Sequence, residues 1–250
     1  MKHADDMISH NLKAFERDKA VDMFNVHTLQ TPEHVIFDLL PLNTMSVLDL
    51  GVGTGRTTPF LAPHSKSYIG TDYSEPMIVE CKKQFPDEEF RVCDARNMSF
   101  DKKFDFIFFS FNGIDNMPHE DRITTLKEIK AFLNPRGSFA FSTHNIYGAR
   151  KLFHIQLNRK PKRMFESIKR WYKTTTVNPP WSVVRAKDHI VINEGAHALA
   201  LQQYHIKPEA QIAQLQSIGF TNIRVFDLQG QQLQDPFYTE DSWVYYLCSN

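Results

Sequence analysis

A glycine-rich stretch directly after a short apolar run is the feature that most constrains the fold of this chain. The apolar run is Val47-Leu48-Asp49-Leu50, which is typical of a buried strand that is covered on both faces. Gly51, Gly53 and Gly55 follow at once, and glycine adopts positive φ and places no Cβ between the backbone and a neighbour. Residues 57–58 begin a helix whose free N–H groups point back toward the turn. The stretch therefore predicts a strand, a tight turn and a helix, which is the opening unit of an α/β sheet.

The spacing of the glycines separates two classes of ligand. Dinucleotide-binding enzymes use the turn G-x-G-x-x-G to seat a pyrophosphate. Here the third glycine comes one residue early, and Asp49 stands two residues before the first glycine. The pattern Asp49-x-Gly51-x-Gly53-x-Gly55 resembles the first motif of the class I S-adenosylmethionine-dependent methyltransferases. The resemblance implies that the loop packs on the methionine part of this cofactor, whose ammonium and sulfonium suit a carboxylate. A plain α/β turn with chance glycines is the alternative.

Two further acidic residues follow the next predicted strands. Asp72 ends the second strand, at the distance from the loop where a carboxylate accepts hydrogen bonds from ribose hydroxyls. The run from Asp72 and Tyr73 to Met77 closely resembles the second motif of the family. It implies that Asp72 binds the ribose and that Met77 lies beside the adenine, with Tyr73 also at the cofactor. Asp94 and Ala95, at the exit of the third strand, resemble the third motif, in which the acid and the next backbone N–H meet the adenine. A surface turn is the alternative for Asp72.

The most apolar segment of the chain ends at Ser110 and predicts a central fourth strand. In the family, the exit of this strand lies beside the transferable methyl group. The resemblance therefore implies cofactor contacts for Ser110 and Phe111. It makes Asn112 and Asp115 candidate catalytic residues and Asn116 a candidate substrate contact. Asp115 and Asn116 could instead be ordinary turn formers or helix caps.

A predicted helix over residues 121–133, stopped by the turn Asn134-Pro135-Arg136-Gly137, leads to a fifth strand over 138–143. This order matches the family, so the resemblance covers about residues 45–145. It implies a doubly wound, seven-stranded Rossmann-like α/β sheet, mostly parallel with an antiparallel last strand, and a cap insertion of helices and a β-hairpin. We expect a single domain over residues 1–250, with N-terminal lid helices (1–44), a cofactor-binding half (45–145), the cap insertion (146–206), and a last helix with strands six and seven (207–250).

The insertion over residues 146–206 breaks the alternation of strands and helices and is rich in Arg, Lys and aromatic residues. Two short strands, 189–195 and 196–201, are predicted to form its hairpin. Related methyltransferases carry a cap over the substrate at this place, so Arg163 and Tyr204 are candidate substrate residues. A basic, aromatic cap indicates an anionic substrate or an anionic surface, and a solvated basic helix face is the alternative.

Composition excludes several other classes of protein. A formal net charge of zero argues against a general nucleic-acid binder. Cys81, Cys93 and Cys248 are far apart, which is typical of free thiols in a reduced cytosolic protein. The chain lacks both the apolar run of a signal peptide and a run of about twenty apolar residues that could span a membrane. We therefore expect a cytoplasmic protein with a small-molecule partner, and its oligomeric state stays open.

Methyl transfer is an in-line displacement at a sulfonium, in which the cofactor supplies the chemistry and the protein supplies alignment. A base is needed only when the acceptor is protonated or weakly nucleophilic. His144 is the leading candidate, because it ends the fifth strand and imidazole titrates near neutrality. A histidine that only satisfies a backbone group is the alternative, and His27, His119, His197 and His205 are weaker candidates. No histidines and carboxylates have metal-ligand spacing, so we expect no metal.

Three functions remain open from the sequence. The first is transfer of a methyl group from S-adenosylmethionine to an O or N atom of a small acceptor, which the basic cap suggests is anionic, and the product is S-adenosylhomocysteine. The second is a sensor or scaffold that binds the cofactor without catalysis. The third, a nicotinamide-dependent oxidoreductase, is disfavoured by the glycine spacing.

Overall fold

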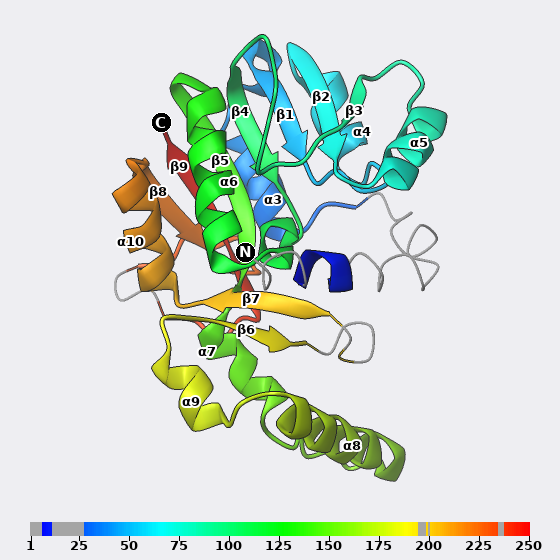
Figure 1. The fold of residues 1–250 in the computed structure, drawn as a ribbon, viewed down its shortest axis with the longest axis vertical. Coiled ribbons are helices and arrows are strands. Elements are labelled where there is room, and N and C mark those ends of the chain that lie inside the picture. Colours follow the sequence, from blue (N-terminus) through cyan, green and yellow to red (C-terminus); the bar gives the residue numbers. More distant parts are fainter. Residues whose placement is uncertain (1–6, 12–27, 195–198, 200, 235–237) are drawn as a thin grey trace.

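The computed structural model describes residues 7–11, 28–194, 199, 201–234 and 238–250. In this part of the chain, one nine-stranded sheet carries helices on both faces (Figure 1). Strands β3, β2, β1, β4 and β5 are parallel in that order, β9 runs antiparallel beside β5, and β8 pairs with β9. The predicted doubly wound, seven-stranded sheet with an antiparallel last strand is thereby confirmed. These strands are β1 (Ser46–Leu50), β2 (Ser67–Asp72), β3 (Phe90–Val92), β4 (Phe104–Phe109), β5 (Leu133–Asn145), β8 (Thr221–Phe226) and β9 (Trp243–Ser249).

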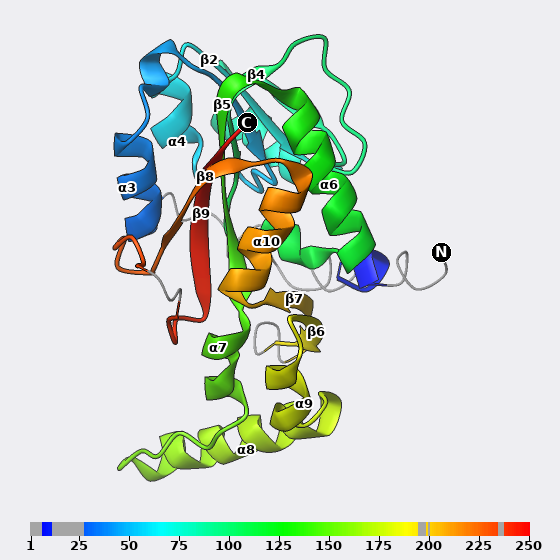
Figure 2. The ribbon, with the colours of Figure 1, turned by 90° about the vertical axis from the view of Figure 1, so that its left-hand side faces the viewer.

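Each face of the sheet buries its own apolar core, because successive side chains of a strand point to opposite faces. Strand β4 shows the alternation: Phe106 and Phe108 pack into one cluster, and Ile107 and Phe109 pack into the other. Helices α3, α4 and α5 cover the first cluster, and α6 and α10 cover the second (Figure 2). The covering helices are α3 (Thr31–Asp38), α4 (Thr58–Leu61), α5 (Glu75–Gln84), α6 (His119–Phe132) and α10 (Pro208–Ile218), with 3₁₀ turns η1 (Leu42–Thr44), η2 (Ala62–His64) and η3 (Gly113–Asn116).

Strand β5 begins earlier than predicted. The segment Asn134-Pro135-Arg136-Gly137 was expected to be a turn before the strand, but it lies within β5 as an irregularity. The register with β4 shifts between Phe104 and Phe106, and Arg136 has φ 66°. The turn-forming residues thus produce a bulge and not a chain reversal, since a bulge accepts extra residues while the pairing continues.

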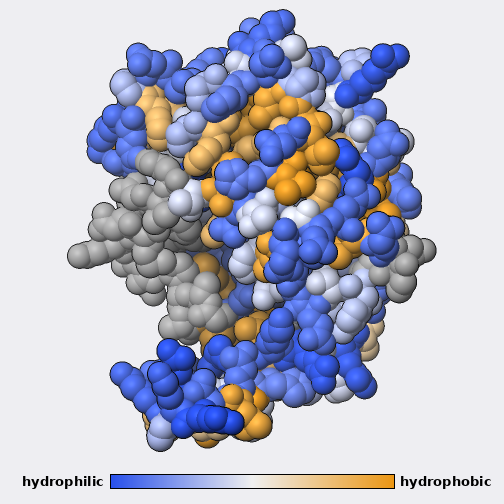
Figure 3. All heavy atoms as spheres, turned by 180° about the vertical axis from the view of Figure 1, so that it is seen from behind, coloured by the Kyte–Doolittle hydropathy of each residue, from blue (hydrophilic) through white to orange (hydrophobic). Residues whose placement is uncertain are grey.

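The insertion after β5 forms an arm that extends away from the sheet (Figures 1 and 2). Its hairpin joins the main sheet, because His144 and Asn145 of β5 pair in parallel with His205 and Ile206. The predicted second hairpin strand, 196–201, lies largely outside the described residues, and the strand that pairs with β6 is Gln202–Ile206. At the end of the arm, hydrophilic residues lie beside an apolar patch (Figure 3). The arm consists of α7 (Ile146–Ala149), η4 (Arg150–Leu152), α8 (Pro161–Val177), α9 (Trp181–Ala186), β6 (His189–Asn193) and β7 (Gln202–Ile206).

The N-terminal segment reaches the body of the molecule at two places. Helix α3 starts at Thr31, with Gln30 as its N-cap residue. Residues 7–11 are helical, and residues 1–6 and 12–27 of the predicted lid segment lie outside the described residues. No helix in the described part of the chain combines the length and the apolar character that a membrane crossing requires.

Candidate functional site

The glycine loop after β1 has the backbone that its sequence predicts. Gly51 and Gly53 have φ 62° and 58°, values that residues with a Cβ atom rarely adopt. A Cβ on Gly51 would lie 2.7 Å from the Phe109 ring, whereas a Cβ on Gly53 would meet no atom within 4 Å. Gly51 therefore allows the loop to pack on β4. Gly53 allows the left-handed turn of the backbone, and the space next to its Cα is open.

Asp49 lies buried beneath this loop. Its Oδ2 accepts hydrogen bonds from Thr57 Oγ1 (2.5 Å) and from the Tyr68 hydroxyl (2.9 Å). Its Oδ1 is buried and has no hydrogen-bond partner among the described residues. Burial raises the pKa of the Asp49 carboxyl to about 7, although both hydrogen bonds act in the opposite direction. A buried acceptor of this kind is costly when it has no partner.

Asp72 connects the loop to the neighbouring strand. It ends β2, and its two carboxylate oxygens accept the backbone N–H groups of Gly53 (3.0 Å) and Ser74 (2.9 Å). Burial raises the pKa of Asp72, and these N–H groups limit the rise. The backbone N–H of Tyr73 acts in the same direction, so three of the about four lone-pair positions are used and the carboxylate can still accept one further hydrogen bond. Of the other predicted contacts on this side, Tyr73 is exposed and Met77 is half-buried.

Asp94 is more fully occupied than the sequence suggested. Its carboxylate accepts hydrogen bonds from the backbone N–H of Arg96 (2.9 Å) and from the Arg96 guanidinium (2.6 Å at the shortest). Arg96 also contacts Asp121 at 2.8 Å. Ala95 is partly buried against the core. A role for Asp94 and Ala95 at an adenine ring stays a prediction, and it requires Asp94 to share its oxygens with Arg96.

The exit of β4 turns sharply. Phe111 and Asn112 have φ 51° and 57°, two successive non-glycine residues in the left-handed region, each of which costs about 1–3 kcal/mol. Ser142 Oγ accepts the Asn112 N–H at 2.8 Å, and the Arg56 guanidinium lies 4.9 Å from the centre of the Phe111 ring. Ser110, just before the turn, is buried. The turn directs the Asn112 side chain toward the end of β5.

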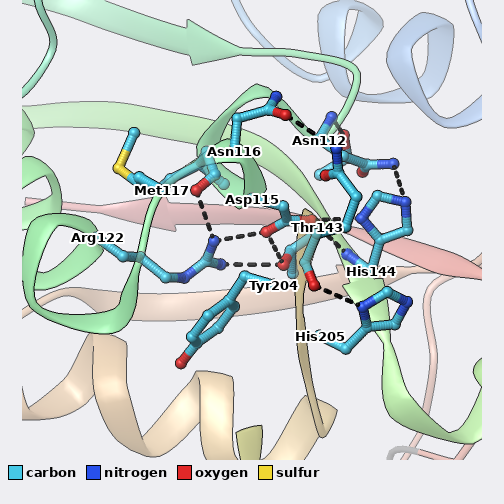
Figure 4. Close-up of polar contacts among 12 residues, drawn as sticks. Asn112, Asp115, Asn116, Met117, Arg122, Thr143, His144, Tyr204 and His205 are labelled. Carbon is cyan, nitrogen blue, oxygen red and sulfur yellow. Dashed lines mark hydrogen bonds and ion pairs between the residues drawn. The ribbon is translucent and has the colours of Figure 1, made fainter. Parts of the chain in front are cut away.

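Asp115, on η3, is the centre of a buried polar network (Figure 4). Its Oδ1 accepts hydrogen bonds from Arg122 Nη1 and Thr143 Oγ1, both at 2.6 Å. Its Oδ2 accepts the backbone N–H of His144 at 2.7 Å and contacts His144 Nδ1 at 2.8 Å. All four lone-pair positions of the carboxylate are used, so Asp115 fixes the position of β5 and its terminal histidine and is not available to a ligand.

Arg122 completes the network from α6. Its Nη2 donates to Thr143 Oγ1 (3.0 Å) and to Gln211 Oε1 (2.7 Å). Its guanidinium lies 4.7 Å from the centre of the Tyr204 ring, and the Tyr204 hydroxyl contacts His119 Nδ1 at 2.8 Å. The structure therefore places Tyr204 as an aromatic cover for Arg122, with its hydroxyl already engaged.

His144 lies between two carboxylates. Its Nδ1 faces Asp115, and its Nε2 lies 2.8 Å from Oε2 of Glu194, which follows β6. The His205 ring stacks on it with centroids 4.8 Å apart. Burial alone would lower the pKa of His144, but Glu194 and Asp115 outweigh burial and raise this pKa to about 10. At neutral pH the imidazole is thus a cation, and both of its nitrogens donate.

The neighbouring Asn112 amide fits this protonation state in one orientation. Its Nδ2 is placed 3.4 Å from His144 Nε2, and its Oδ1 is buried without a partner among the described residues. Two donors cannot bond each other, and the oxygen and nitrogen of an amide exchange places on rotation by half a turn. An amide that presents Oδ1 to His144 removes the meeting of two donors, so in this orientation Asn112 shares the Nε2–H with Glu194.

Replacement of Glu194 by glutamine is expected to lower the pKa of His144, because the substitution removes a negative charge next to Nε2 and leaves the side-chain shape unchanged. NMR titration of the His144 ring protons, assigned by comparison with His144→Gln, measures the change. Glu80→Gln removes a half-buried carboxylate elsewhere and should leave the titration unchanged. A His144 pKa that stays near 10 in Glu194→Gln would show that Asp115 alone sets it.

The structure brings some of the predicted site residues together and leaves others apart. Asn116 lies beside the network, where its Oδ1 accepts from Gln203 Nε2 at 2.9 Å. Arg163 does not join this group, because it lies exposed on α8. Arg122 and Glu194 were missed. A charged residue at position 122, on the same helix face as Leu126 and Ile129, was the available signal for a buried ion pair. For Glu194 the sequence carries no comparable signal.

Comparison with known proteins agrees with this architecture. The "Methyltransferase domain" family matches residues 47–137. The demethylmenaquinone methyltransferase of Thermotoga maritima is 37% identical over 109 residues, which cover 42% of this chain and 46% of that protein. The chain thus spans less than half of the length of this curated relative.

Two solved structures share the fold over nearly the whole chain. A crystal structure of an S-adenosylmethionine-dependent methyltransferase from Clostridium acetobutylicum covers 96% of this chain and 98% of its own, with a TM-score of 0.62 and 17% identity. The glycopeptide N-methyltransferase MtfA, solved with S-adenosyl-L-homocysteine, covers 90% of this chain and 91% of its own, with a TM-score of 0.59 and 16% identity. Residues 47–137 thus match a methyltransferase domain, and the chain has the fold of the class I S-adenosylmethionine-dependent methyltransferases.

Proposed function

We propose that this protein transfers the methyl group of S-adenosylmethionine to a nitrogen or oxygen atom of a small molecule. One observation carries the proposal: Asp72, the glycine loop, Asn112 and His144 stand at the carboxyl ends of the four adjacent parallel strands β2, β1, β4 and β5. Ligands of open α/β sheets bind at these strand ends. The site therefore has a cofactor side, on β1 and β2, and an acceptor side, on β4 and β5.

The residues on the cofactor side fit S-adenosylmethionine. Asp49 Oδ1 lacks a donor, and the ammonium of the methionine part would supply one. Gly53 leaves space beside the loop, and the remaining acceptor position of Asp72 suits a ribose hydroxyl. When bound, the cofactor supplies an electrophilic methyl group on a sulfonium, and the protein aligns it. The relative MtfA was solved with the demethylated product, which supports this assignment.

On the acceptor side, Glu194 marks the position of the acceptor. Its carboxylate contacts the one nitrogen of His144 that Asp115 does not engage. An acceptor that displaced Glu194 would remove the charge that most favours the imidazolium, so the pKa of His144 would fall toward neutrality. His144 could then take the proton of an amine or hydroxyl, while Asp115 keeps Nδ1 protonated. The basic side chains that suggested an anionic acceptor lie on α8, apart from this group (Figure 1).

The test measures binding and transfer separately. Calorimetry with S-adenosylhomocysteine reports on the cofactor side, and incubation with methyl-labelled S-adenosylmethionine and a metabolite extract reports transfer. Binding with label transfer to a small molecule supports the proposal. Binding without transfer would favour a sensor or scaffold, and binding of NADH in place of S-adenosylhomocysteine would favour an oxidoreductase.

Asp72→Ala is expected to weaken binding of S-adenosylhomocysteine about 10- to 150-fold, which corresponds to about 1.5–3 kcal/mol for lost charge-assisted hydrogen bonds. Calorimetry measures the affinity, and Asp87→Ala, an exposed acid near β3, is the matched control. Because Asp72 also holds the Gly53 N–H, the thermal stability of the variant is measured alongside. Unchanged affinity in a folded Asp72→Ala protein would contradict the ribose contact.

A further inference from the structure

Helix α8 turns its apolar side toward solvent. Phe165, Ile168 and Tyr172, spaced for one helix face, are 69%, 42% and 66% exposed. Ser167 and Thr174 are buried instead, about 140° around the helix from that face. This arrangement is the reverse of an ordinary surface helix, whose apolar side faces the core.

Polar contacts hold the buried side of α8 to the rest of the arm. Ser167 Oγ accepts the backbone N–H of Gln156 at 2.7 Å, and the helix ends at Asn178, whose side chain bonds Asn193 of β6. The apolar residues Phe165, Ile168 and Tyr172 belong to none of the three buried clusters of the described chain. The exposure of this face is therefore fixed by the way the helix is anchored.

Basic side chains border the apolar face. At 100° per residue, Lys162, Lys169 and Lys173 follow it on one side and are exposed, and the exposed Arg163 lies further around the helix. Glu166 is the one acidic residue of the helix. Helix α8 forms the far end of the arm, and its axis runs roughly across the long axis of the molecule (Figure 2). Hydrophobic and hydrophilic residues lie side by side on the surface there (Figure 3). The helix can therefore lie flat on a surface while the sheet stands clear.

We propose that α8 binds the surface of an anionic lipid bilayer, with Phe165, Ile168 and Tyr172 in the headgroup region and the lysines at lipid phosphates. An amphipathic helix with aromatic and aliphatic residues on one face and Lys or Arg on the other has the features of interfacial binding. Long lysine side chains reach the headgroups while their stems cover apolar surface. A second copy of the same face would bring like charges together, and a nucleic acid would leave the apolar residues uncovered.

Vesicle sedimentation with the full chain tests the proposal. The protein is expected to sediment with phosphatidylcholine vesicles that contain phosphatidylserine and to stay in solution with phosphatidylcholine alone. Each lysine near an anionic surface contributes about 1 kcal/mol, so Lys162→Gln/Lys169→Gln/Lys173→Gln should weaken partitioning about 100-fold. Phe165→Ser/Tyr172→Ser should weaken it at least about tenfold, since two large apolar groups no longer leave water.

Matched controls separate this surface from net charge and from folding. Lys82→Gln/Lys103→Gln/Lys127→Gln removes the same charge from exposed positions outside α8 and should bind as the wild type does. All substituted side chains are exposed, so circular dichroism and the unfolding midpoint should not change. Equal binding to both kinds of vesicle, no binding to either, or an equal loss in the control would overturn the proposal. A stable dimer that Phe165→Ser/Tyr172→Ser dissociates would also overturn it, because the face would then belong to a second copy.

Discussion

Asp115→Ala is expected to destabilise the protein by about 3–5 kcal/mol, the cost of leaving a buried charge without its partner. Asp115 is fully buried and is the only carboxylate that contacts Arg122 among the described residues. Without it, the Arg122 guanidinium loses its counter-charge, and the Thr143 hydroxyl and the His144 N–H lose their acceptor. Urea unfolding followed by circular dichroism measures the change in the free energy of unfolding.

Two further variants distinguish a buried network from an ordinary ion pair. Asp121→Ala removes a partly exposed partner of Arg96 and should cost no more than about 1 kcal/mol. The double variant Asp115→Ala/Arg122→Met should recover part of the stability, because it removes the unpaired charge as well. If Asp115→Ala and Asp121→Ala cost the same, Asp115 would not have the central role that its contacts indicate.

The cofactor side could be predicted from the sequence because its signals are local. Glycine spacing, the preceding apolar run and Asp49 stand within a few residues of one another, and the turn backbone at Gly51 and Gly53 follows from them. Asp72 could be placed because parallel strands align their carboxyl ends at one edge of a sheet. What the sequence could not supply is the contact between Asp72 and the Gly53 N–H, which depends on the register of β1 and β2.

The acceptor side could be predicted only in part, because its contacts join distant segments. His144, Asp115 and Asn112 were identified as candidates from the ends of strands, but Glu194 reaches His144 only because the hairpin pairs with the end of β5. The described second strand of the hairpin begins at Gln202, after the predicted range 196–201. Register there is set by pairing of His205 with β5, and a local pattern of apolar residues carries no information about that pairing.

For the insertion, the sequence predicted a helix face but not whether that face is buried. The basic, aromatic character of residues 159–173 was visible in the sequence, and the structure forms α8 there. Periodicity indicates which residues share a face, but not whether that face meets the core. The small residues Ser167 and Thr174 contact the arm, so the apolar side remains outside.

His144→Ala is expected to reduce turnover about 10²–10⁴-fold if the histidine accepts the acceptor's proton in the proposed reaction. Affinity for S-adenosylhomocysteine should hold, because His144 ends β5 and the cofactor side stands on β1 and β2. His154→Ala, an exposed histidine of the arm, is the matched control and should keep full turnover. Steady-state kinetics of the labelled methyl transfer measure the effect.

The pH dependence of the same reaction distinguishes a base from a positioning group. In the free protein the pKa of His144 is raised to about 10, so the imidazole is protonated below that pH and cannot accept a proton. The value of kcat/KM reports ionisations of the free enzyme, so it should rise with pH up to about 10 in the wild type. In Glu194→Gln the rise should occur at lower pH, and in His144→Ala it should disappear, apart from any ionisation of the acceptor itself. A pH profile of unchanged shape in His144→Ala, together with reduced turnover, would show that His144 positions the acceptor and takes no proton from it.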